Sequence, residues 1–229
     1  MTARVIRHAA LMLALTLGLA PAPGPGLAAE DPAPPPAPSG TPPASPALAA
    51  TRALVAKLAG AGRGEAPVIV SQSDPMGGPG REDRAQLVLE PPDRVRLDFS
   101  RTGERIALRG DGGEWVQPAA KQLVRIRREQ AGLATWLWEV FLKGGGDAFA
   151  ERASGERRYT LEPRDREAGL PVRITLILDP VGLPAEVRLV ERDSVEIRYR
   201  FRGWSFRSAK GPGAFTLTAP HGYVVVDLP

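Results

Sequence analysis

The chain has 229 residues, of which 43% are hydrophobic and 24% are charged, with 24 prolines and no cysteine. Its 30 basic and 26 acidic residues are interspersed and give a formal net charge of +4, which argues against a nucleic-acid-binding surface. The lack of cysteine excludes disulfides, thiol catalysis and lipid attachment through a cysteine.

The first 29 residues have the features of a secretory signal peptide. An arginine-containing start precedes an uncharged apolar run at 9–20, which is shorter than the roughly 20 residues of a membrane-spanning helix. We expect cleavage near Ala28 or Ala29, and an uncleaved membrane anchor is the alternative. Removal of 1–29 leaves 28 basic and 26 acidic residues, so the exported chain is nearly neutral.

A linker and a helix follow the signal. Residues 30–47 are mostly Pro, Ala, Ser and Gly, a composition typical of a disordered, semi-rigid tether, and we expect one folded domain over 48–229. The pair Ser45-Pro46 suits the N-cap and first position of a helix. Mostly apolar residues then recur at helical spacing: Leu48, Thr51, Leu54, Val55 and Leu58. We predict an amphipathic helix that ends at Gly60 and Gly62.

From Val68 onward the dominant period is two. Apolar and polar residues alternate at 85–89, 95–99, 172–178 and 195–202. Such alternation predicts antiparallel strands with one dry and one wet face. Turn-forming residues separate the runs, for example at 111–113, 179–182 and 210–213. The sequence predicts a mainly β (α+β) protein with few helices, with roughly nine to eleven short strands in one curved sheet or barrel.

A second helix interrupts the strands. Its apolar stripe consists of Leu133, Trp136, Leu137, Val140 and Phe141, and glycines at 144–146 end it. Trp138 and Leu142 fall off this stripe, so the helix is apolar around more of its circumference than one core contact needs. It either plugs the end of a barrel or covers an apolar cavity as a lid, with the glycines as a hinge.

The chain offers little for catalysis. Without residues 1–29, His221 is the only histidine, and it lies in a turn-like Pro-His-Gly sequence. Thiol and histidine-rich metal sites are therefore excluded, and a catalytic triad and a phosphate-binding loop are not indicated. A hydrolase that uses carboxylates remains as an alternative. We expect a binding protein that is not an enzyme and needs no metal or cofactor.

Four short motifs occur in a recognisable order. They are Pro92–Arg96, Asp111-Gly112 with Trp115, Leu161–Arg164, and the segment Ala214–Asp227. With the signal and the order of helices and strands, they resemble the periplasmic lipoprotein carrier LolA and its superfamily over about residues 48–228. The last segment resembles the closing strand of that family.

This resemblance implies an incomplete antiparallel barrel with helices over an apolar cavity for acyl chains. A monomeric periplasmic carrier of this kind takes lipoproteins from an inner-membrane release complex to an outer-membrane receptor. The candidate lining residues are Leu97, Phe99, Trp115, Trp136, Leu137, Val140, Phe141, Leu176, Leu189, Ile197, Tyr199 and Phe201.

The chain departs from the family pattern at two positions of the first strand run. Pro91 stands where the carriers have an arginine that holds the lid, and Leu97 replaces a tryptophan. Arg94 and Arg96 alternate with the apolar residues, so we expect them on the opposite face. The alternatives are therefore a carrier of another lipid, or a sensor or adaptor with the same fold.

Overall fold

The computed structural model describes residues 47–73, 80–127, 137–164, 173–190 and 195–227. The chain divides into Met1–Ser45 and Pro46–Pro229, and every described residue belongs to the second unit. The predicted signal peptide and nearly all of the predicted linker lie outside the described residues, so both stay predictions.

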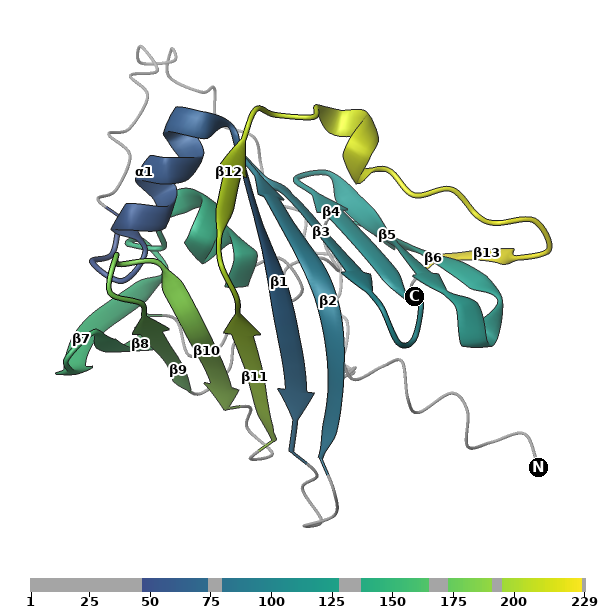
Figure 1. The fold of residues 1–229 in the computed structure, drawn as a ribbon. Helices are drawn as coiled ribbons and strands as arrows, with labels where there is room; N and C mark the ends of the chain where they lie inside the picture. Colours follow the sequence, from purple (N-terminus) through teal and green to yellow (C-terminus); the bar gives the residue numbers. More distant parts are fainter. Residues whose placement is uncertain (1–46, 74–79, 128–136, 165–172, 191–194, 228–229) are drawn as a thin grey trace, which may run out of the picture. The chain divides into compact units, whose positions relative to one another are not determined.

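One sheet of 13 strands organises the described ranges (Figure 1). Its order is β13-β6-β5-β4-β3-β2-β1-β11-β10-β9-β8-β7, and β12 also pairs with β1. The strands are β1 Arg63–Gln72, β2 Arg81–Glu90, β3 Arg94–Phe99, β4 Arg105–Arg109, β5 Gly112–Gln117, β6 Gln122–Arg127, β7 Phe149–Gly155, β8 Arg158–Pro163, β9 Arg173–Leu178, β10 Pro184–Val190, β11 Glu196–Phe201, β12 Ser205–Arg207 and β13 Val224–Asp227.

The sheet is antiparallel and open. Each neighbouring pair of strands is antiparallel except β13 and β6, which are parallel, and the end strands β13 and β7 are not paired with each other. The predicted mainly β, incomplete antiparallel barrel is confirmed. The strands outnumber the expected nine to eleven because β12 and β13 have three and four residues, too few to display a period of two.

Helix α1, Arg52–Ala61, begins later than the sequence predicts. The backbone N–H groups of Ala49 and Ala50 donate to the carboxylate of Glu151 at 2.9 and 2.8 Å, and Thr51 Oγ1 donates to the carbonyl of Leu48 at 3.2 Å. These bonds hold the segment before Arg52 as a turn. The predicted cap at 45–46 lies outside the described residues, and Thr51 takes the N-cap position instead.

The predicted end of α1 is confirmed. Gly62 follows the last helical residue with a φ of 98°, and its N–H donates to the carbonyl of Leu58 at 2.8 Å. A left-handed residue at this position favours glycine, because any Cβ would be strained there. Leu54 and Leu58 are the buried residues of the helix.

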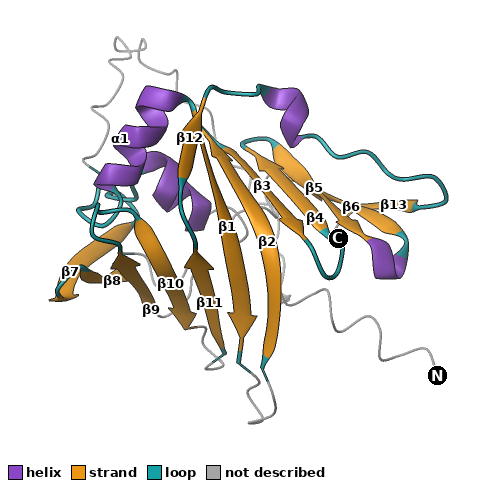
Figure 2. Cartoon of the chain, viewed as in Figure 1, coloured by secondary structure: helices purple, strands orange, loops and turns teal. Residues whose placement is uncertain are grey.

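A second helical segment, residues 137–143, lies on the same side of the sheet as α1 (Figure 2). The predicted start of this helix at Leu133 lies outside the described residues, as does Trp136. Within the part of the chain that the structure describes, no helix is long and apolar enough to cross a membrane.

The C-terminal segment differs from the predicted closing strand. Pro212–Phe215 forms a short 3-10 helix, η4, and only Val224–Asp227 is a strand. A second 3-10 turn, η3 at Pro118–Ala120, precedes β6. The segment 212–223 crosses the face of the sheet that lies away from α1. Its alternating apolar residues pack against this face and do not pair with a neighbouring strand. The prediction failed because alternation reports one buried side, whether or not a neighbouring strand is present.

Candidate functional site

Strand register places the apolar residues of distant strands on one face. Leu97 lies opposite Ile106, which lies opposite Trp115. Phe99 is linked in the same way through Ala85 and Val68 to Phe201. Residues that oppose each other in register point to the same side of a sheet. We call this side, which packs against α1 and residues 137–143, the inner face.

The rows continue across the second half of the sheet. Tyr199 lies opposite Val187 and Val187 opposite Leu176, while Ile197 lies opposite Leu189. The eight predicted strand residues thus lie together on the inner face. The described candidates are all buried, with at most 7% of their surface exposed: Leu97, Phe99, Trp115, Leu137, Val140, Phe141, Leu176, Leu189, Ile197, Tyr199 and Phe201.

Aromatic contacts join residues 137–143 to the inner face. The ring of Phe141 meets the ring of Phe201 edge-on, with centroids 5.9 Å apart. Trp138 meets Tyr199 in the same manner at 5.5 Å and lies 6.2 Å from Phe141. Edge-on pairs of this kind add to the energy of apolar burial. This part of the inner face is therefore packed with protein.

Trp138 belongs to this packing although the helical spacing does not predict it. The spacing places Trp138 and Leu142 off the apolar stripe, yet both are buried. The predicted stripe is counted from Leu133. Because this helix is apolar on several sides, helical spacing alone does not tell which side faces the core. The tendency of tryptophan to dominate apolar contacts is the signal that favours including Trp138.

Two glycines tie the helical segment to the start of α1. Gly144 and Gly145 have φ values of 93° and 71°, and the carbonyl of Gly144 accepts bonds from Leu48 N at 3.0 Å and Thr51 Oγ1 at 3.0 Å. A Cβ on Gly144 would lie 2.7 Å from the Cα of Ala47. The predicted glycine hinge is thus a close-packed joint. It connects the ends of the two helices that cover the inner face.

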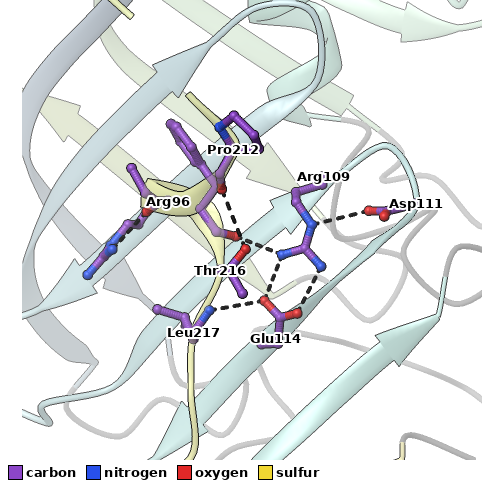
Figure 3. A network of polar contacts seen from close by, with 9 residues as sticks. Arg96, Arg109, Asp111, Glu114, Pro212, Thr216 and Leu217 are labelled. Carbon is purple, nitrogen blue, oxygen red and sulfur yellow. Dashed lines mark hydrogen bonds and ion pairs between the residues drawn. The ribbon is translucent and has the colours of Figure 1, made fainter. Parts of the chain in front are cut away.

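The outer face holds the C-terminal segment through a polar network (Figure 3). Arg109 pairs with Glu114 at 2.8 Å and donates to the carbonyl of Phe215 at 2.7 Å. Glu114 accepts a bond from Leu217 N at 3.3 Å, and Arg96 donates to the carbonyl of Ala214 at 2.8 Å. The hydrogen bond that Arg109 donates to the carboxylate of Glu114 raises the pKa of Arg109 above its ordinary value. These side chains hold the backbone of the segment in place.

Both arginines near the first strand run lie on the outer face, as predicted. Arg96 lies opposite Ala107, which belongs to the apolar cluster beneath Leu217. Arg94 pairs with Glu90 at 3.1 Å and lies 5.9 Å from the ring of Phe215. Neither is placed to hold the helices on the inner face. Their role is to anchor the C-terminal segment.

A half-buried carboxyl group lies beside the inner face. Trp115 Nε1 donates to Glu104 Oε2 at 3.2 Å. Burial raises the pKa of Glu104, the bond from Trp115 opposes this shift, and the nearby charge of Asp83 adds to it. The bond fixes the orientation of the indole ring of Trp115.

His221 is exposed in a turn, and no group of three or more metal-ligating side chains occurs in the described ranges. An open hollow of about 310 Å³ is lined by Glu82, Asp83, Arg84, Ser100 and Arg101. Its charged lining does not suit an apolar ligand.

No protein-family model matches the sequence, and no curated protein sequence matches it. Among similar solved structures, an uncharacterized conserved protein from Thermus thermophilus is 14% identical, with a TM-score of 0.49 over 78% of this chain and 97% of that one. A LolA superfamily protein from Nitrosomonas europaea is 9% identical, with a TM-score of 0.40 over 73% and 97%. A putative outer membrane lipoprotein-sorting protein domain from Vibrio parahaemolyticus is 11% identical, with a TM-score of 0.40 over 72% and 95%. The family that the sequence resembles is thus among these similar structures, but likeness this distant assigns no function to the chain.

Proposed function

We propose that the chain is an exported, non-enzymatic carrier whose inner face binds the acyl chains of lipoproteins and shuttles them from the inner to the outer membrane. One observation carries this proposal. The inner face is apolar in continuous rows from Trp115 on β5 to Leu176 on β9, and two helices joined at Gly144 lie against it.

The energetics suit an acyl cargo. Each buried methylene contributes about 0.8 kcal/mol, so an acyl chain with roughly 14 methylenes gains about 11 kcal/mol when it leaves water. This gain has no directional requirement, and a face of aliphatic and aromatic side chains supplies it.

Acyl binding requires the helical cover to give way. Phe141 and Trp138 occupy the inner face along β11, and an acyl chain that replaces them there makes apolar contacts of the same kind. The apolar surface that the acyl chain buries then offsets the apolar surface that the helical cover exposes when it moves. Because the two helices are joined at Gly144, we expect them to move together.

Acyl-probe titration tests this proposal. Phe141→Asp places a carboxylate on the helical cover, against the inner face, and should abolish binding of a fluorescent fatty acid, whereas Phe141→Ala should retain it. Val181→Asp is the matched control, because Val181 is 73% exposed in the turn between β9 and β10. Circular dichroism identifies folded variants. Equal probe affinity in all three folded variants would contradict the proposal.

The alternation of β10 and β11 supplies a second test. A photoreactive acyl probe should label the inner residues Leu189, Ile197 and Tyr199, and leave their outer neighbours Arg188 and Arg198 unlabelled. Labelling of both sets alike would place the probe on the outside of the protein. A sensor or adaptor on the same fold predicts no acyl labelling.

A further inference from the structure

One edge of the sheet ends in exposed valines. Val224, Val225 and Val226 of β13 are 65%, 44% and 38% exposed. β13 pairs with β6 on one side, and no strand in the described ranges pairs with the backbone groups of its other edge. Soluble proteins usually protect such an edge with charges, prolines or a covering segment. Three consecutive exposed valines on an edge strand therefore indicate a contact surface.

The inner face runs into this edge. Trp115 lies opposite Val124, and Val124 lies opposite Val226. Val226 therefore extends the row that begins with Leu97 and Ile106 out to the border of the sheet. An apolar chain that reaches β13 from outside meets the inner face without crossing a polar strand.

Basic side chains flank the valines. Lys121, Arg125 and Arg127 are exposed on or just before β6, and Asp227 is the acidic residue opposite Arg125. Neither Lys121 nor Arg125 forms an ion pair with a residue in the described ranges. The local charge at this edge is positive and fits an anionic surface.

We infer that the edge formed by β13 and Lys121–Arg127 docks on the anionic headgroups of a lipid bilayer, and that acyl chains pass to the inner face across it. This inference rests on the proposed function, which requires the carrier to meet a membrane. The valines point to both sides of a short strand, and the interfacial zone of a bilayer accepts apolar side chains on both sides while it pairs with cations. An added peptide strand accounts for the free backbone edge but leaves the basic side chains unexplained.

Vesicle co-sedimentation tests the docking surface on protein expressed from the full-length sequence. Binding should occur on vesicles with phosphatidylglycerol and be absent on pure phosphatidylcholine. Lys121→Gln with Arg125→Gln should weaken it about 30-fold. The matched charge control is Arg81→Gln with Arg101→Gln, two exposed arginines at the start of β2 and in the turn after β3, which should leave binding unchanged.

The valines have their own control. Val224→Ser with Val226→Ser should weaken binding to anionic vesicles, and Val181→Ser should not. Vesicle binding that the control variants and the edge variants weaken equally overturns the inference. Acyl-probe affinity in solution separates the two proposals. Probe binding without vesicle binding refutes the docking edge alone, and vesicle binding without probe binding refutes the carrier.

Discussion

Replacement of Glu151 by alanine removes the carboxylate that anchors the start of α1. Two backbone donors, Ala49 N and Ala50 N, lose an acceptor at 2.9 and 2.8 Å. Hydrogen bonds to a charged group contribute about 1.5–3 kcal/mol each when buried, and the partial exposure of this pair reduces the total to about 2 kcal/mol. For a chain of this size, that corresponds to a Tm about 6 °C lower.

The same change should loosen the helical cover, because Glu151 holds the turn that joins α1 to Gly144. We expect faster uptake of a fluorescent fatty acid by Glu151→Ala in stopped-flow mixing, with Glu151→Gln in between. Glu156→Ala is the control, since Glu156 lies in the next turn with its side chain 86% exposed. A Glu151→Ala variant that matches this control in both Tm and uptake rate would refute the anchoring role of Glu151.

Further predictions concern single positions. Gly144→Ala should cost at least about 2 kcal/mol in urea denaturation because its Cβ meets backbone, whereas Gly203→Ala, with φ of 62° and open space, should cost about 1 kcal/mol. Phe215→Ala should cost about 3–5 kcal/mol and release the C-terminal segment to limited proteolysis, since its side chain is fully buried. Because the pKa of Glu104 is raised in the folded state, burial of its carboxylate destabilises the fold at neutral pH. This destabilisation decreases as the pH falls toward 4.5 and the carboxyl group becomes protonated. Glu104→Gln should therefore be more stable than the wild type at neutral pH, and this advantage should shrink on acidification; a constant difference across the pH series would contradict it.

The inner face could be predicted from the sequence because a strand with one dry side records that side in every second residue. The alternation in 95–99 places Leu97 and Phe99 on one side of their strand, and the alternation in 195–202 places Ile197, Tyr199 and Phe201 on one side of theirs. It also placed Arg96 on the other face. What alternation does not encode is the partner that covers a dry side.

That limit explains the errors. Phe215 and Leu217 alternate like a strand, but the outer face of other strands covers them, and arginine and glutamate side chains hold their backbone. The predicted start of α1 is too early because Glu151, about a hundred residues away, competes for the first N–H groups. Long-range polar contacts of this kind leave no local pattern in a sequence.

Native mass spectrometry of protein expressed from the full-length sequence and purified from the periplasm tests the carrier proposal most directly. We expect an added mass that corresponds to an acylated lipid or lipoprotein, that is removed by delipidation and that returns when acyl cargo is supplied. A bare chain that takes up no acyl species, or a chain found only with a protein partner, would contradict the proposal.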